Sequence, residues 1–128
     1  MFRLAPLAVA ALLITGCSHN GTSSMILSSE DQCPVTLDMG QQLILTLPSN
    51  PTTGFRWELR DAADSILESL GQEVYQSDND HLVGSGGKST WRFQARDYGE
   101  GRLLLVYQRP WEDGAEPEQH FQCELRVR

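Results

Sequence analysis

The stretch that decides the fold is residues 42–59, which read QLILTLPSNPTTGFRWEL. Its first half places a leucine at every second position, and its last residues alternate in the same way. A period of two puts such side chains on one face of a β-strand. Between the two runs, Pro51 fixes one backbone angle and Gly54 permits a positive one, which is typical of a rigid, sharply curved turn. The stretch therefore predicts a strand, a tight turn and a second strand.

The same alternation recurs along the chain. Alternating runs begin at Cys33, at Ser89 and at Phe121, and residues 103–107 are apolar on both faces, as a central strand would be. With a short run around Val74, this gives about seven short strands separated by polar turns. We therefore predict an all-β fold, an immunoglobulin-like antiparallel β-sandwich.

The first residues predict export. Residues 4–14 are apolar apart from a break at Pro6, a length that suits the core of a secretory signal better than a membrane-spanning helix. They end in Ile14-Thr15-Gly16-Cys17, which resembles a bacterial lipobox, where the signal is cut before a cysteine that then receives lipid. We expect a lipoprotein signal peptide in residues 1–16, a flexible tether with lipidated Cys17 in 17–30, and one domain in 31–128. The alternative is an ordinary signal peptide with an incidental cysteine.

Lipidation would attach the domain to the membrane of a bacterial cell envelope. Ser18, rather than an aspartate, follows the lipidated cysteine, and this favours sorting to the outer membrane. We therefore expect the domain to face the periplasm or the cell surface.

The net charge limits the possible partners of the protein, and the two remaining cysteines indicate how its chain is cross-linked. The net charge of −7 makes nucleic acid a poor partner. Cys33 and Cys123 remain after Cys17, and both fall on the inward phase of a predicted strand, so they can meet across a core. An exported chain with two such cysteines favours a disulfide, and the alternative is a pair of buried free thiols.

Three short segments fall at matching places between the predicted strands. Successive connections in a sandwich alternate between its two ends, so the second, fourth and sixth lie at one end, like the binding loops of immunoglobulin variable domains. These connections contain residues 50–55, 84–87 and 109–112. Taken singly, each has an ordinary explanation: a tight turn, a glycine-rich loop without phosphate-loop spacing, and a tryptophan that caps the core.

Taken together, the segments resemble the motifs of the chagasin family of cysteine-protease inhibitors. The matching residues are Asn50-Pro51-Thr52-Thr53-Gly54-Phe55, Gly84-Ser85-Gly86-Gly87 and Arg109-Pro110-Trp111, in this order and spacing. The resemblance covers about Val35 to Val127. It implies an immunoglobulin-like fold and reversible, tight inhibition of papain-family proteases by a wedge of three loops.

The resemblance also implies a role for each segment. Thr52 and Thr53 would sit over the catalytic cysteine and histidine of the protease without offering a cleavable carbonyl. The glycine-rich segment would pair with the substrate groove through its backbone. Arg109, Pro110 and Trp111 would pack on the far side of the catalytic centre, and Glu112 is adjacent to them.

Two other classes of function compete with an inhibitor. An enzyme is disfavoured because the three histidines are scattered and no nucleophile or metal-ligand spacing is present. A structural or adhesive immunoglobulin-like lipoprotein would not need three specific loops at one end. We expect a monomer that binds a papain-like cysteine protease and the membrane, with no cofactor, no metal and no nucleic acid.

Overall fold

The computed structural model describes residues 2, 5–6, 9–13, 16, 23–79, 81–112 and 114–128. The predicted lipidation site, Cys17, lies outside the described residues. Within the described part of the chain, no helix is long and apolar enough to cross a membrane. Its helical pieces are two short 3-10 turns, η1 (Glu30–Gln32) and η2 (Pro51–Thr53).

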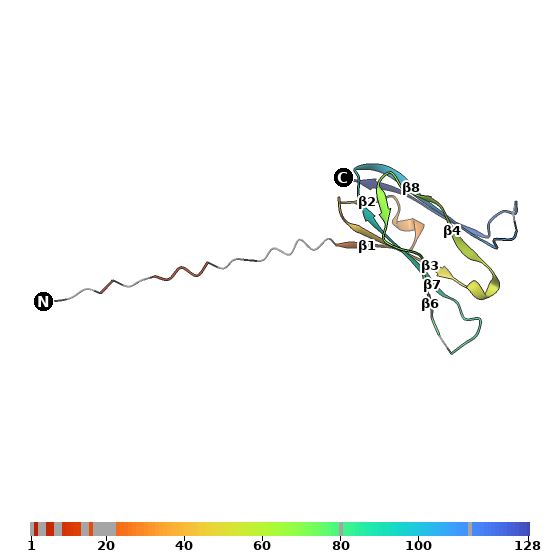
Figure 1. The fold of residues 1–128 in the computed structure, drawn as a ribbon, viewed down its shortest axis with the longest axis horizontal. Coiled ribbons are helices and arrows are strands. Elements are labelled where there is room, and N and C mark those ends of the chain that lie inside the picture. Colours follow the sequence, from red (N-terminus) through yellow and green to blue (C-terminus); the bar gives the residue numbers. More distant parts are fainter. Residues whose placement is uncertain are drawn as a thin grey trace.

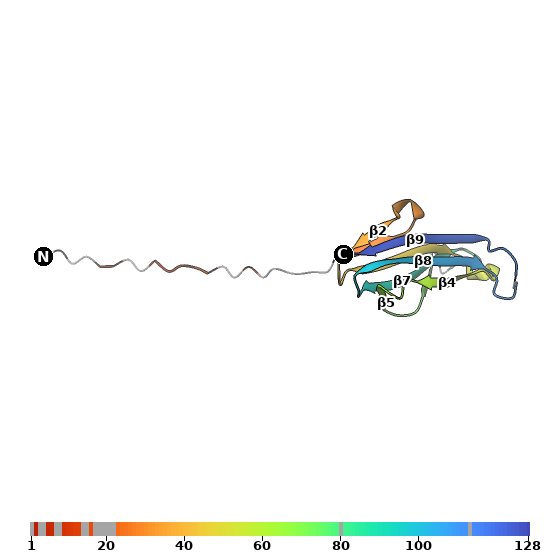
Figure 2. The same ribbon diagram turned by 90° about the horizontal axis from the view of Figure 1, so that it is seen from above.

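The described strands form two sheets that enclose one core (Figures 1 and 2). The five-stranded sheet has the order β1–β3–β7–β5, and β6 also pairs with β7. Its strands are β1 (Ser24–Leu27), β3 (Gln42–Ser49), β5 (Leu67–Ser69), β6 (Val74–Ser77) and β7 (Gly87–Ala95). The four-stranded sheet has the order β2–β9–β8–β4. Its strands are β2 (Val35–Leu37), β4 (Arg56–Ala62), β8 (Gly99–Gln108) and β9 (Gln119–Val127).

The core follows from the alternation in the sequence. Every second residue of β7 is buried, and so is every second residue of β9 from Phe121 onward. Leu43 of β3 lies opposite Phe93 of β7, and Leu105 of β8 lies opposite Phe121 of β9. Burying a side chain of this size contributes about 1.5–3 kcal/mol, so the two inner faces hold the sheets together. The predicted immunoglobulin-like β-sandwich is confirmed.

The described chain has nine strands, where about seven were expected. The two additional ones, β1 and β5, are only four and three residues long. The sheets are also mixed, because β1 pairs with β3 in parallel and β2 pairs with β9 in parallel. Both parallel strands lie at sheet edges, so the antiparallel framework predicted for the remaining strands is unaffected.

The prediction of a flexible tether in residues 17–30 is wrong from Ser24 onward. Leu27 of β1 is fully buried in the core. After β1, Ser29 and Gln32 form a capping box around η1, and Glu30 accepts a hydrogen bond of 2.7 Å from the backbone N–H of Gln122 in β9. The chain therefore crosses from the edge of one sheet to the edge of the other as part of the domain.

Cys33 and Cys123 form the predicted disulfide, with Cα atoms 5.4 Å apart. The expected geometry is wrong in one respect, since the bond does not cross the core between sheets. Cys33 lies just before β2, and β2 is the neighbour of β9 in the same sheet. The bond therefore fastens the edge segment that leads into β2 to the strand that carries Cys123.

We predict that replacing both cysteines by alanine lowers the free energy of unfolding by roughly 3–5 kcal/mol. The bond joins residues 90 positions apart, and a cross-link of that span removes much of the freedom of the unfolded chain. Urea unfolding of both proteins, monitored by tryptophan fluorescence, measures the difference. Unfolding the native protein with and without a reductant provides the control, and a loss below about 1 kcal/mol by both routes would contradict the prediction.

Candidate functional site

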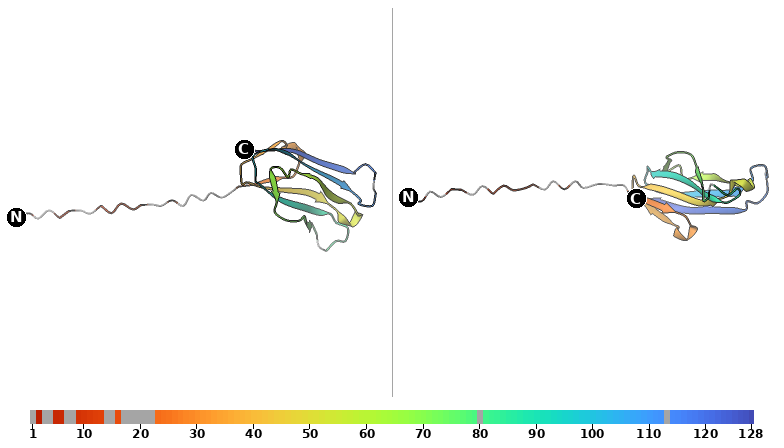
Figure 3. Two further views of the ribbon diagram at one scale, coloured as in Figure 1. Left: turned by 45° about the horizontal axis from the view of Figure 1, so that its top comes forward. Right: turned by 90° about the horizontal axis from the view of Figure 1, so that it is seen from below.

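The three predicted segments lie at one end of the sandwich (Figure 3). They follow β3, β6 and β8 in the chain. Ser49 and Ser77, the last residues of β3 and β6, both pair with Gly87, the first residue of β7. Gln108, the last residue of β8, pairs with Arg56, the first of β4. The strand registers alone therefore bring the three loops together.

The β3–β4 loop is rigid because its polar side chains bond within it. The side-chain oxygen of Asn50 accepts hydrogen bonds from the backbone N–H and the hydroxyl of Thr52, at 3.3 and 2.5 Å. The hydroxyl of Thr53 donates to the carbonyl of Asn50 at 2.7 Å. Pro51 begins η2, and Gly54 ends it with φ of 83°, a conformation that favours glycine. Thr52 and Thr53 are exposed at the tip.

Asn50 also connects this loop to its surroundings. Its side-chain amide donates to the carbonyl of Gly84 in the β6–β7 loop at 3.3 Å. Its backbone N–H donates to the hydroxyl of Tyr107 in β8 at 3.0 Å. One residue thus links the central loop to the second loop and to the facing sheet.

The β6–β7 loop is closed by hydrogen bonds at its base and exposes apolar side chains at its tip. Gly86 accepts a backbone hydrogen bond from Asp78, and the hydroxyl of Ser85 lies 3.1 Å from the carbonyl oxygen of Leu82. Leu82 is 61% exposed and its neighbour Val83 is fully exposed. Such a pair beside a binding loop is a candidate contact for an apolar partner surface.

Gly87 has a different role from the one that the resemblance implies. It is buried between β3 and β6, and a Cβ there would overlap the carbonyl oxygen of Gln76. Its backbone belongs to the β7 ladder, so the backbone that this loop can offer to a partner ends at Gly86.

The β8–β9 loop contacts the central loop through two side chains. Nε of Arg109 donates to the carbonyl of Thr53 at 3.3 Å, and the guanidinium lies 4.5 Å from the centre of the Phe55 ring. Trp111 is 68% exposed, yet it packs against Gly54, since a Cβ at Gly54 would overlap its indole ring. The absence of a side chain at Gly54 therefore makes room for Trp111.

A stack of aromatic rings supports the loops from below. Phe55 stacks on Tyr107 with ring centres 5.3 Å apart, and Tyr107 lies 4.9 Å from Trp57. The indole N–H of Trp57 donates to the carbonyl of Pro48 at 2.8 Å. Trp57 and Tyr107 belong to the core, so the loops rest directly on it.

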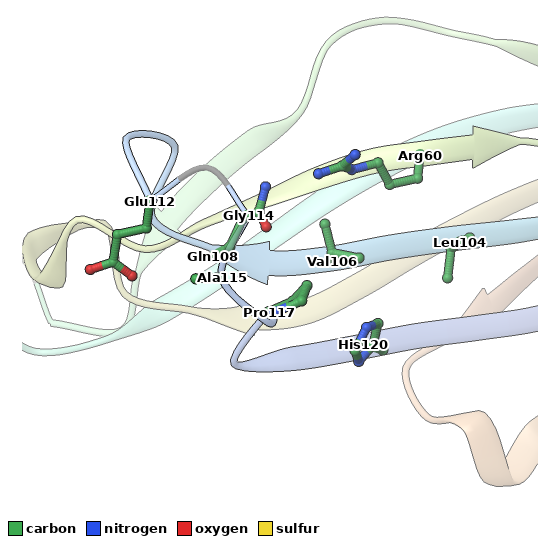
Figure 4. A pocket seen from close by; sticks show the side chains of 9 residues that line it. All are labelled: Arg60, Leu104, Val106, Gln108, Glu112, Gly114, Ala115, Pro117 and His120. Carbon is green, nitrogen blue, oxygen red and sulfur yellow. The ribbon is translucent and has the colours of Figure 1, made fainter.

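A hollow of about 650 Å³ lies beside this surface, on the outer face of the four-stranded sheet (Figure 4). Its floor includes Leu104 and Val106, and Pro117 of the β8–β9 loop forms part of its wall. Of the predicted binding residues, only Glu112 lines it. The predicted site is thus a protruding surface, and the hollow is a separate feature at its side.

The structure therefore brings the three predicted segments into direct contact. It adds Tyr107, Leu82 and Val83, which the sequence did not single out. An apolar pair directly before a glycine in a polar loop is a signal that would have indicated Leu82 and Val83. Nothing in the sequence pattern distinguishes Tyr107 from any other buried residue of a central strand.

The fold and the site together define a β-sandwich binding protein that uses loops at one end. Comparison with known proteins supports this class of protein. Residues 36–125 match the family described as Chagasin family peptidase inhibitor I42. Chagasin of Trypanosoma cruzi is 27% identical over 108 residues, which cover 82% of this chain and 98% of chagasin.

Two solved structures share the fold. The cysteine protease inhibitor EhICP2 from Entamoeba histolytica has a TM-score of 0.71 at 22% identity, covering 83% of this chain and 96% of that one. PbICP-C, solved in complex with falcipain-2, has a TM-score of 0.56 at 15% identity, covering 84% and 92%.

The chain belongs to the chagasin family of peptidase inhibitors. This confirms the family that the three motifs indicate. The family is one of inhibitors and not of enzymes.

We predict that Gly54→Ala displaces Trp111, whereas Gly84→Ala does not. Both glycines have φ of 83°, so alanine costs roughly 1–2 kcal/mol of stability at either position. Only at Gly54 would the new methyl group overlap the indole, since a Cβ at Gly84 meets no described atom within 4 Å. Acrylamide quenching of tryptophan fluorescence should therefore rise only in Gly54→Ala. Equal quenching in both variants would show that Trp111 does not rest on Gly54.

Proposed function

We propose that this protein is a reversible, tight-binding inhibitor of papain-family cysteine proteases. In this proposal its three loops enter the active-site cleft of the protease together, as one wedge. The observation that carries the proposal is the direct bonding of both outer loops to the central one, through Asn50 with Gly84 and Arg109 with Thr53. A member of an inhibitor family that presents such a surface is suited to block a cleft.

The relatives support the class of target. EhICP2 is described as a cysteine protease inhibitor, and PbICP-C was solved with falcipain-2 bound. Family membership also favours an inhibitor over a structural or adhesive lipoprotein, which would have no need of the three motifs.

The exposed groups divide into three kinds of contact. Thr52 and Thr53 form the tip and would cover the catalytic cysteine and histidine. The backbone from Gly84 to Gly86 would pair with the substrate groove, with Leu82 and Val83 supplying apolar side chains to it. Trp111 would pack against the opposite wall of the cleft, where a tryptophan is among the commonest binding hot spots.

Rigidity explains how a small surface can bind tightly. Each side chain that becomes immobilised on binding costs about 0.5–1.5 kcal/mol. Here the hydrogen bonds around Asn50 and the packing of Trp111 on Gly54 order the loops before any partner arrives. The closed η2 turn also presents hydroxyl groups at its tip, and so it places no extended peptide over the catalytic centre.

We further propose that residues 1–16 are a lipoprotein signal and that lipid on Cys17 holds the inhibitor at the cell envelope, most simply at the outer membrane. The fold suits this arrangement, because β1 runs parallel to β3 and Ser24 pairs with Gln42, at the end of β3 farthest from Asn50. β1 therefore begins at the end of the sandwich opposite the loops (Figure 1). Replacing Cys17 by serine should release the protein from the membrane fraction, and retention there would refute lipid anchoring.

A titration tests the function. Residues 23–128 contain every described strand and both disulfide cysteines, and the oxidised fragment is added to papain with a fluorogenic substrate. We expect loss of papain activity at a molar ratio of about one, with trypsin unaffected. A folded, oxidised sample that leaves papain active at micromolar concentration would refute the proposal.

We predict that Trp111→Ala raises the inhibition constant about 30- to 1000-fold. This range corresponds to the roughly 2–4 kcal/mol expected for a central aromatic anchor. Tyr98→Ala is the matched control, because Tyr98 is 71% exposed and lies between β7 and β8, at the opposite end of the sandwich. The control should change the constant less than twofold. A rise below threefold for Trp111→Ala would remove Trp111 from the proposed interface.

A further inference from the structure

The described polar contacts of the Arg109 side chain are with two residues of the binding loops, Thr53 and Glu112. Its Nε donates to Thr53 in the central loop, and its Nη1 lies 3.3 Å from Oε1 of Glu112 in its own loop. Its Cζ lies over the ring of Phe55, 4.5 Å from the ring centre. The side chain is partly buried, with 38% of its surface exposed.

The ion pair with Glu112 closes a turn that contains Trp111. The backbone N–H of Glu112 donates to the carbonyl of Arg109 at 3.1 Å, so residues 109–112 form a turn closed by both a backbone bond and a side-chain bond. Trp111 lies within this turn and packs on Gly54 of the central loop. Its position therefore depends on the two residues that close the turn.

The contact with Phe55 joins the same turn to the core. The guanidinium, the ring of Phe55 and the ring of Tyr107 follow one another, and Tyr107 is buried. A planar guanidinium can stack on a ring and donate in its own plane at the same time, which a lysine ammonium cannot do. These contacts therefore suit an arginine better than a lysine.

We propose that Arg109 is a positioning residue of the inhibitor, which fixes Trp111 relative to Thr52 and Thr53 before the protease binds. The resemblance implies instead that Arg109 packs against the enzyme together with Trp111. Our proposal rests on the proposed function and assigns the effect of Arg109 to the order of the free loops. It predicts that the effects of Arg109 and Trp111 on binding are not independent.

A double-mutant cycle tests this on the full chain in detergent, with papain as the target. We expect Arg109→Ala to raise the inhibition constant about tenfold, the scale of ordering one or two side chains on binding. In a Trp111→Ala background the same change should add less than threefold, because the residue that Arg109 positions is gone. Arg109→Lys should behave like Arg109→Ala. Fully additive effects, or full recovery by lysine, would overturn the proposal.

Fluorescence of the free protein gives a second readout that needs no protease. Trp57 and Trp91 are buried, with 7% and 6% of their surfaces exposed. The difference between the fluorescence of the native protein and that of Trp111→Ala gives the contribution of Trp111. We expect the fast component of its anisotropy decay to grow in Arg109→Ala and in Arg109→Lys. An unchanged decay would overturn the proposal.

Arg126→Ala is the matched control. Arg126 also forms an ion pair, with Glu100, and β9 carries it toward the end of the sandwich opposite the loops. It should change neither the inhibition constant nor the anisotropy. If the native protein did not inhibit papain at all, the proposed function would fail, and the anisotropy of the free protein would still decide the role of Arg109.

Discussion

The contact on which the binding end depends is the packing of Tyr107 between Phe55 and Trp57. Tyr107 lies on β8, an inner strand of the four-stranded sheet, while its hydroxyl accepts the backbone N–H of Asn50 at the end of β3, in the other sheet. A single side chain thus joins both sheets and the central loop. Aromatic pairs of this kind add about 0.5–1.5 kcal/mol beyond the area that they bury. The central loop is therefore anchored directly to the core.

This support explains why a binding surface can be built from turns. Loops of a small domain are usually its least stable part, because few buried contacts hold them. Here each outer loop contacts the central loop, and the central loop stands on buried rings. The surface protrudes, while the hollow on the four-stranded sheet lies at its side and includes only Glu112 of the predicted binding residues. A protein built in this way fits a concave partner.

The sequence predicted the parts of the fold that depend on local pattern. The strict alternation of β7 and β9 placed both strands, and the motifs placed the three loops. It missed β1, because four residues after a polar segment carry no periodic signal and their partner, β3, is known only from the tertiary fold. It paired Cys33 with Cys123 correctly but placed them across the core, since alternation gives the face of a strand and not its neighbour. Gly87 was assigned to a partner because a glycine-rich segment does not reveal that β6 packs against it.

Stability and binding geometry rest on separate constraints in this domain. The disulfide fastens the segment before β2 to β9, at the edge of one sheet, and none of the contacts described between the three loops involves either cysteine. The loops depend instead on β3, β4 and β8, through Asn50, Phe55 and Tyr107. A cross-link acts mainly by restricting the unfolded chain, whereas the aromatic packing acts on the folded state. The disulfide therefore contributes to the stability of the domain, whereas the geometry of the loops depends on packing in which neither cysteine takes part.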